Sequence, residues 1–301
     1  MEVIKVIPSG YCKGVINAIN KVKKAIKDYP DKQIYILGML VHNKYVVGGF
    51  ELFNVITLAD KNKTKEQLLD EIDDGVVVFT AHGIDPKIKQ KALDKGLIVV
   101  DATCCDVTKN ANLCIQHLNE GYDVAYIGKK NHPESEAVLA LDERIHLITN
   151  IQDVQNSNIL NDKILITNQT TMSINDIEQI IKALLVKYPL AKVVEEICSA
   201  TRTRQQAVKE LEGFDTLIVV GDPNSNNTTQ LANIGKQAKI KNIYKIENSL
   251  ELTSINLDNI SKVAVTSGAS TPGYLTQQVI DYLKTRDEKY LNVDLEKILD
   301  L

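Results

Sequence analysis

The chain has 301 residues, of which 44% are hydrophobic and 25% are charged, and its formal net charge is −4. This apolar content suffices for a sizeable core, and the length fits three small α/β domains better than one large sheet. The negative charge and the absence of a basic run argue against nucleic-acid binding, and without a signal-peptide pattern or a long apolar run we expect a cytoplasmic protein with no membrane contact.

The first unit, residues 1–98, begins with the apolar run Val3–Ile7, which predicts a strand that leads to Cys12. The apolar residues from Val15 to Ile26 recur at helical spacing and predict a helix after the cysteine. Later strands of this unit end in loops with polar residues, which are His42-Asn43 and, after Val76–Phe79, Ala81-His82-Gly83.

The second unit, residues 99–195, repeats this order around Cys104, which follows the strand-like run Leu97–Val100. Helical spacing from Val107 to Leu118 predicts the helix after it. The polar loops of this unit are His132-Pro133-Glu134 and, after Ile164–Ile166, Gln169-Thr170-Thr171.

The third unit, residues 196–284, places Cys198 after the run Val193–Ile197. The helix expected next, Thr201–Leu211, is more polar and is the weakest match of the three. The polar loops are Asn224-Ser225-Asn226-Asn227 and, after Val263–Val265, Gly268-Ala269-Ser270. The charged segment 285–301 is expected to be a C-terminal tail that packs on the surface or across one domain.

Strands that alternate with helices predict an α/β fold with largely parallel sheets. In such sheets ligands bind beyond the carboxyl ends of the strands, where all of these polar loops would lie. Asp85, Ser173 and Ser270 each resemble the start of a helix. Because helix N-termini present free backbone N–H groups to anions, a centre ringed by them suits a phosphate-bearing ligand.

Cysteine returns at nearly constant spacing, since Cys12, Cys104 and Cys198 lie 92 and 94 positions apart. A single buried cysteine is most often a small core residue. Three in equivalent strand-to-helix loops instead indicate a metal site with one open position. Either a zinc ion or an iron–sulfur cluster could occupy it, and the residues alone leave these two metals undecided.

Two other cysteines and two histidines favour structural interpretations. Cys114 lies on the apolar stripe of its predicted helix and is assigned to the core. Cys105 directly follows Cys104, so we expect it to point elsewhere and to be a bystander. His117 falls on a predicted helix, and His146 falls in a short strand-like run. The wide separation of the five cysteines favours reduced thiols over a disulfide framework.

Three histidines, His42, His82 and His132, lie in the loops expected at strand ends. They could bind a diphosphate together with the side chains of Ser225, Asn227 and Ser270. Alternatively, an imidazole could complete the metal site and make it structural. Glu134 is either a first-turn acid that favours the helix dipole or a general acid facing the metal, with Thr170 relaying the proton.

The ordered set of motifs resembles the 4-hydroxy-3-methylbut-2-enyl diphosphate reductase family from about residue 1 to residue 283. The motifs are Gly10-Tyr11-Cys12-Lys13-Gly14-Val15, Ala81-His82-Gly83, Asp101-Ala102-Thr103-Cys104, His132-Pro133-Glu134, Gln169-Thr170-Thr171, Ile197-Cys198, Asn224-Ser225-Asn226-Asn227 and Gly268-Ala269-Ser270-Thr271-Pro272.

The resemblance implies a trefoil-like, pseudo-threefold arrangement of three α/β domains around a central cavity. It implies one 4Fe-4S cluster per chain, with one open iron and the ligands Cys12, Cys104 and Cys198. It also implies a catalytic set of Glu134, Thr170 and His132. The substrate would be bound by His42, His82, His132, Thr170, Ser225, Asn226, Asn227 and Ser270.

The reaction implied by the resemblance is reductive dehydroxylation of 4-hydroxy-3-methylbut-2-enyl diphosphate to isopentenyl diphosphate and dimethylallyl diphosphate. This is the last step of the methylerythritol phosphate route to isoprenoids. The two electrons would come from a reduced ferredoxin or flavodoxin, because the chain has neither a G-x-G-x-x-G fingerprint nor a second cluster motif. The rival functions are a zinc hydrolase that uses the three-cysteine site on a phosphorylated small molecule, and a non-catalytic phosphate-binding module.

The sequence departs from the usual family pattern at a few positions. Lys13 stands where a small residue is usual, Cys105 where proline is usual, and Asn226 where serine is usual. Neither of the first two changes removes a proposed ligand. At Asn226 an amide can donate as the serine hydroxyl does, but it is larger. In the segment Thr201-Arg202-Thr203-Arg204, only Thr201 and Arg204 match the family.

Overall fold

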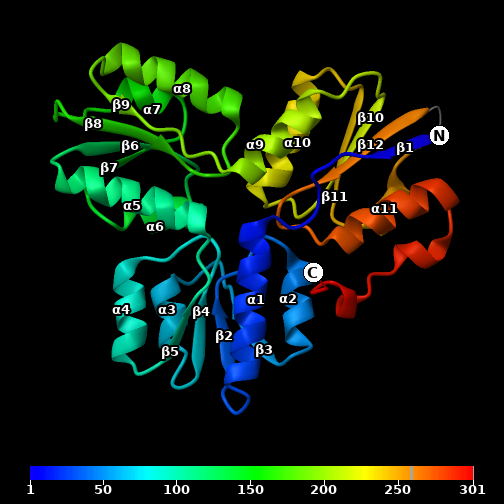
Figure 1. Cartoon of the computed structure of the whole chain (residues 1–301), viewed down its shortest axis with the longest axis horizontal. Coiled ribbons are helices and arrows are strands. Elements are labelled where there is room, and N and C mark those ends of the chain that lie inside the picture. Colours follow the sequence, from blue (N-terminus) through cyan, green and yellow to red (C-terminus); the bar gives the residue numbers. More distant parts are fainter. Residues whose placement is uncertain (258–259, 301) are drawn as a thin grey trace. The chain divides into compact units, whose positions relative to one another are not determined.

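A computed structural model of the chain describes residues 1–257 and 260–300. Its strands form three four-stranded parallel sheets, each flanked by helices (Figure 1). Parallel neighbours need crossover connections, and the helices between successive strands supply them. The predicted α/β class with three similar parallel sheets is therefore confirmed.

One sheet has the strand order β3-β2-β4-β5. Its strands are β2 (Ile34–Leu37), β3 (Val55–Leu58), β4 (Val76–Phe79) and β5 (Ile98–Asp101). The helices of this part of the chain are α1 (Lys13–Asp28), α2 (Lys44–Glu51), α3 (Lys65–Asp70) and α4 (Pro86–Asp94). Every residue of β4 is buried, which explains its continuous apolar sequence, because helices cover both faces of a parallel sheet.

The second sheet has the order β7-β6-β8-β9. Its strands are β6 (Asp123–Ile127), β7 (Ile145–Ile148), β8 (Ile164–Asn168) and β9 (Lys192–Val193). Its helices are α5 (Cys105–Asn119), α6 (Pro133–Leu139), α7 (Ile151–Asn156) and α8 (Ile174–Lys187). The strand predicted over Val193–Ile197 is wrong beyond its first residue, since β9 ends at Val193.

The third sheet has the order β1-β12-β10-β11. Its strands are β1 (Glu2–Lys5), β10 (Thr216–Val220), β11 (Asn242–Ile246) and β12 (Lys262–Ser267). Its helices are α9 (Ser199–Lys209), α10 (Asn226–Gln237) and α11 (Gly273–Thr285). The N-terminal strand thus pairs with β12, with Val3 opposite Val263.

The chain divides into two compact units. One comprises Met1–Ile19, Val41–Thr57 and the chain from Ser199 onward, and the other comprises Asn20–Leu40 and Leu58–Cys198. The domain limits expected near residues 98, 195 and 284 stay a prediction, as does the arrangement of the sheets around a common cavity.

Helix starts and core positions agree largely with the sequence pattern. Asp85 and Ser173 cap α4 and α8 with their side chains, as predicted. Cys114 is fully buried in an apolar cluster with Leu118 and Tyr126, as predicted. Ser270 was expected to cap a helix, which is wrong. Helix α11 begins only after Pro272, whose ring fixes a backbone angle suited to a helix start.

The C-terminal tail packs against its own unit. The hydroxyl of Tyr11 donates to the carbonyl of Ile298 at 2.9 Å, and the Ile298 side chain is fully buried. Leu299 lies against Gly49 of α2, where an added Cβ atom would come within 3.1 Å of it. The tail includes the short helices η2 (Glu288–Leu291) and η3 (Leu295–Lys297), and only its last residue, Leu301, lies outside the described residues.

In the part of the chain that the structure describes, no helix combines the length and the apolar character that crossing a bilayer requires.

Candidate functional site

The three cysteines of the repeat share one backbone environment. Each directly precedes a helix, because α1 begins at Lys13, α5 at Cys105 and α9 at Ser199. The backbone N–H of each cysteine donates to a carbonyl in the loop that follows β12, β4 or β8. These bonds run from Cys12 to Ala269 at 3.0 Å, from Cys104 to Ala81 at 3.0 Å and from Cys198 to Thr170 at 3.1 Å. The equivalence expected from the spacing therefore extends to the hydrogen bonds.

These three thiols have the chemistry of metal ligands. None of the three is in a disulfide and all are partly exposed, whereas the Cys114 thiol is buried. Thiolates are soft ligands that suit zinc and iron–sulfur clusters, and partial exposure leaves them open to an incoming metal. Burial raises the pKa of the Cys104 thiol to about 12, so this thiol is protonated near neutral pH in the metal-free chain. The donor set fits a thiolate-bound metal group.

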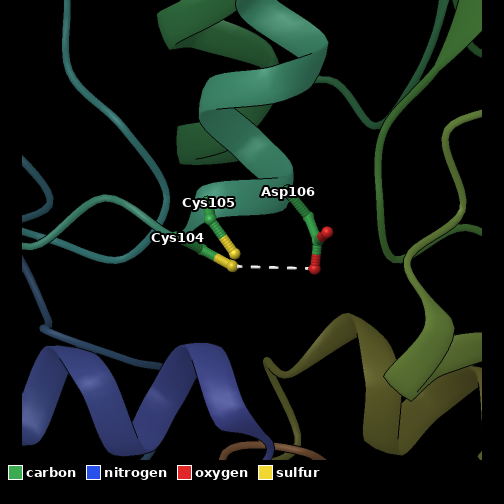
Figure 2. Close-up of side chains that lie close together, drawn as sticks. All are labelled: Cys104, Cys105 and Asp106. Carbon is green, nitrogen blue, oxygen red and sulfur yellow. Dashed lines mark hydrogen bonds between the residues drawn. The ribbon is translucent and has the colours of Figure 1, made fainter.

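Cys105 and Asp106 lie beside Cys104 at the start of α5. Figure 2 shows the two sulfur atoms next to each other, with the Asp106 carboxylate facing them. The ligand atoms of the three residues all lie within 4.8 Å of one another, and the Cys104 thiol donates to Oδ2 of Asp106 at 4.0 Å. No other group of three or more His, Cys, Asp and Glu side chains reaches this proximity in residues 1–257 and 260–300. The expectation that Cys105 points away from Cys104 is wrong.

Glu134 is a buried acid held by two hydrogen bonds. Its side chain is only 2% exposed. The Thr170 backbone N–H donates to Oε1 at 2.7 Å, and the Thr170 hydroxyl donates to Oε2 at 2.9 Å. Burial disfavours the charged form and raises the pKa of Glu134 to about 7, although the bonds from Thr170 act in the opposite direction. The predicted pairing of Glu134 with Thr170 is confirmed as a contact, and a carboxyl with this pKa can hold or release a proton near neutrality.

His132 starts the helix that carries Glu134. It is the N-cap residue of α6, and its Nδ1 accepts from the Glu134 backbone N–H at 3.2 Å. This bond places the proton of the neutral ring on Nε2, the nitrogen that can donate to an anion. The rings of His82 and His132 meet edge to face with their centroids 5.7 Å apart. Two histidines that the sequence assigned to strand ends are therefore neighbours.

The other unit gathers a second polar set. The Ser270 hydroxyl donates to the His42 carbonyl at 3.0 Å, which joins the loop after β12 to the segment before α2. Ser225 caps α10, with its hydroxyl oxygen accepting from the Thr228 backbone N–H. Asn227 accepts from the Thr201 hydroxyl at 3.3 Å. Ser225 and Asn227 are thus polar groups at the N-terminus of α10, the kind of environment that binds phosphate.

Asn226, which departs from the family pattern, is also buried. Its side-chain oxygen accepts from the amide of Gln230 at 3.5 Å, one turn along α10. The amide oxygen is thus used within the helix.

Each compact unit contains part of the predicted set of site residues. One unit carries Cys104, Cys198, His82, His132, Glu134 and Thr170. The other carries Cys12, His42, Ser225, Asn226, Asn227 and Ser270.

Sequence reasoning missed a glycine that directly follows one strand of each sheet. Gly38 follows β2, Gly128 follows β6 and Gly221 follows β10. A Cβ atom on Gly128 would come within 2.6 Å of Ser135 Oγ, and one on Gly221 within 2.4 Å of Thr228 Oγ1. Gly128 and Gly221 let the next helix approach its strand end closely, whereas Gly38 has a φ of +95°, which favours glycine. The recurrence of glycine at these positions was the signal available in the sequence.

Arg204 was noted only as a match to the family pattern. Its guanidinium donates to the carbonyl of Gly10 at 2.8 Å, so α9 is tied to the loop that holds Cys12. The backbone N–H of Gly10 in turn donates to Ser267 Oγ at 2.7 Å. The Cys12 loop is therefore fixed from two elements of its own unit.

Parallel α/β sheets with thiols, histidines and a buried acid in the segments after their strands fit an α/β enzyme whose thiols are suited to a metal group. A family model described as "LytB protein" matches residues 3–284. The chain belongs to this family.

Named relatives and solved structures agree with this assignment. A 4-hydroxy-3-methylbut-2-enyl diphosphate reductase of Geobacillus kaustophilus is 45% identical, covering 99% of this chain and 97% of that protein. The enzyme of the same name from Halalkalibacterium halodurans is 45% identical over 95% of this chain and 92% of its own length. The prediction of an oxidoreductase is confirmed.

Among solved structures, the E-1-hydroxy-2-methyl-but-2-enyl-4-diphosphate reductase from Plasmodium falciparum has a TM-score of 0.87 and 31% identity, covering 96% of this chain and 90% of that chain. A second structure, of an (E)-4-hydroxy-3-methyl-but-2-enyl diphosphate reductase described as the terminal enzyme of the non-mevalonate pathway, has a TM-score of 0.66 and 29% identity, covering 94% of this chain and 99% of that chain.

Proposed function

We propose that this protein reduces 4-hydroxy-3-methylbut-2-enyl diphosphate to isopentenyl diphosphate and dimethylallyl diphosphate. The proposal includes one 4Fe-4S cluster with the ligands Cys12, Cys104 and Cys198. The observation that carries it is the common backbone anchoring of these three cysteines, each of which precedes a helix and donates to a neighbouring strand-end loop. A chain that only packed cysteines in its core would not repeat this environment, and Cys114 lacks it.

Three thiolates suit a cluster with one open iron. When bound, the cluster would pass on the electrons that it receives from a separate donor and would offer a coordination position to the substrate oxygen. Thiolates on different irons of a cluster stand farther apart than the ligands of one ion. The three proposed cluster ligands therefore differ in spacing from Cys104, Cys105 and Asp106, whose ligand atoms lie within 4.8 Å of one another.

Loss of the substrate hydroxyl as water requires a proton at that oxygen. Glu134 is the acid suited to deliver it, because its pKa of about 7 leaves a large protonated fraction at neutral pH. Thr170 contacts both carboxyl oxygens and would orient the acid and pass on its proton. His132 is fixed at the start of the same helix, where its Nε2–H would donate to the substrate.

The diphosphate needs donors and positive potential. The N-terminus of α10, with the side chains of Ser225, Asn226 and Asn227, supplies backbone and side-chain donors. His42, His82, His132, Thr170 and Ser270 would complete the substrate contacts. The electrons would come from a separate ferredoxin or flavodoxin.

Turnover under anaerobic conditions tests the proposal. Protein loaded with iron and sulfide should convert the diphosphate substrate to the two isoprenoid diphosphates when a chemical or protein reductant is supplied. A colourless protein that binds zinc and releases phosphate would instead support the rival zinc hydrolase. A chain that binds the substrate but leaves it unchanged under every reductant would support the non-catalytic module.

A further inference from the structure

We propose that Cys104, Cys105 and Asp106, here called the dithiol group, form a binding site for one soft divalent cation such as Zn²⁺ or Cd²⁺ in the cluster-free chain. The first support is proximity, since all three ligand atoms lie within 4.8 Å of one another. Figure 2 shows both sulfur atoms on the side that faces the carboxylate. Two thiolates and a carboxylate, with water as the fourth ligand, make a tetrahedral set that zinc accepts.

The distances leave little to rearrange. Zinc–sulfur bonds of about 2.3 Å and zinc–oxygen bonds of about 2.0–2.2 Å place tetrahedral ligand atoms roughly 3.5–3.8 Å apart. The Cys104 sulfur already lies 4.0 Å from Oδ2 of Asp106. Rotation of side chains alone would therefore close the group around an ion.

The backbone that carries these ligands is fixed at both ends of the turn. The Cys104 N–H donates to Ala81 at 3.0 Å, and its carbonyl accepts from the Thr108 N–H at 3.0 Å. Cys104 is the N-cap and Cys105 the first residue of α5. The cap residue has extended backbone angles and the next residue is helical, so two consecutive side chains converge. Such preorganisation reduces the ordering cost of binding.

The group is also accessible. Cys105 is exposed, and Cys104 and Asp106 are partly exposed, so an ion can reach the site from solvent.

The site would compete with cluster assembly, a consequence that rests on the proposed function because it takes Cys104 as a cluster ligand. The Cys104 thiolate cannot bind a zinc ion in the dithiol group and the cluster at the same time. Zinc would thus hold the chain in a form that takes up no cluster until the ion leaves.

Cadmium titration of the full-length, reduced, cluster-free chain tests the site, with ultraviolet thiolate–cadmium absorption as the readout. We expect one tight ion per chain, with two thiolates per ion. Cys105→Ser should weaken cadmium affinity at least about 100-fold. Loss of a residue that only hydrogen-bonds to a metal ligand already lowers metal affinity by about 10–100-fold, and here a ligand itself is lost. Asp106→Asn should weaken it less, because both soft ligands remain.

Cys12→Ser is the matched control, because it removes a thiol outside the group and should leave cadmium affinity unchanged. Equal affinity in Cys105→Ser and the unaltered chain would overturn the proposal. Loss of binding in Cys12→Ser would overturn it too, because the ion would then occupy the three-cysteine site. Protection of Cys104 and Cys105 from alkylation by the bound ion, with Cys198 still reactive, would support the proposal independently.

Reconstitution with iron and sulfide separates this inference from the proposed function. One equivalent of Zn²⁺ should slow cluster formation in the unaltered chain and leave Cys105→Ser unaffected. A chain that forms no cluster even without zinc would contradict the proposed function, and the cadmium stoichiometry would still decide the dithiol group. Equal slowing by zinc in both chains would contradict competition at Cys105.

Discussion

Thr170 donates two hydrogen bonds to the carboxylate of Glu134. Its hydroxyl lies 2.9 Å from Oε2, and its backbone nitrogen lies 2.7 Å from Oε1. The two residues lie 36 positions apart. Glu134 is in α6, the helix that follows β6, and Thr170 is in the loop after the adjacent strand β8. The carbonyl of Thr170 also accepts from the backbone N–H of Cys198. One residue thus links the candidate acid to a candidate metal ligand within the same unit.

Glu134→Gln should abolish most turnover and preserve binding. The amide keeps the shape of the side chain and loses the ionisable proton, so kcat should fall by about 10²–10⁴-fold. Cluster content and substrate KM should remain near those of the unaltered protein, as measured by iron analysis and steady-state kinetics. Full activity in this variant would remove Glu134 from the proton path.

The pKa of Glu134 predicts the pH dependence of turnover. An acid must be protonated to act, and the protonated fraction of a group with a pKa of about 7 falls as the pH rises through that value. We therefore expect kcat to decline above about pH 7. A profile that stays flat from pH 6 to pH 9 would contradict this assignment.

Thr170→Val should move that decline to higher pH. The threonine hydroxyl donates to the charged carboxylate, so its removal disfavours ionisation and raises the pKa of Glu134. A hydrogen bond to a charged group is worth about 1.5–3 kcal/mol, which corresponds to a shift of about one pH unit or more. Serine at this position keeps the hydroxyl and should restore the original profile.

Tyr11→Phe tests the contact between the tail and the Cys12 loop. The change removes the bond to the Ile298 carbonyl and should cost about 1 kcal/mol of unfolding free energy. Because Tyr11 adjoins Cys12, iron should also be lost faster from the loaded protein, as followed by absorbance. Tyr29→Phe, at the end of α1, is the control. Equal iron loss in both variants would show that the tail leaves the Cys12 loop unaffected.

Cys114→Ala tests whether Cys114 is a core residue and not a metal ligand. Cys114 is fully buried in the apolar cluster beside β6. Its truncation should lower the unfolding free energy by about 1 kcal/mol and leave iron content intact. Cys198→Ser should do the reverse, with little change in fold stability and a marked loss of iron. Iron loss in Cys114→Ala would mean that the two classes of cysteine were assigned wrongly.

The sequence predicted the strands, the helices and the residues at strand ends because local patterns carry that information. Apolar runs such as Val76–Phe79 coincide with buried strands, and helical spacing placed Cys114 in the core. The contact between Glu134 and Thr170 agrees with one of the two interpretations of Glu134, in which Thr170 relays its proton.

Other features depend on geometry that the sequence pattern does not state. Cys105 was expected to point away from Cys104, yet the change from extended to helical backbone at the start of α5 turns both side chains to the same side. Ser270 bonds to the His42 carbonyl instead of capping α11. Strand β1 pairs with β12, a partner more than 250 residues away in the chain. A local sequence pattern indicates a strand but does not indicate which distant strand it pairs with.

Iron and sulfide analysis of the anaerobically purified protein tests the central claim most directly. We predict about four iron and four sulfide per chain, and a marked loss of both in Cys12→Ser, Cys104→Ser and Cys198→Ser. A protein that carries no sulfide after anaerobic reconstitution, or that keeps its full iron content when any one of these three cysteines is replaced, would contradict the account.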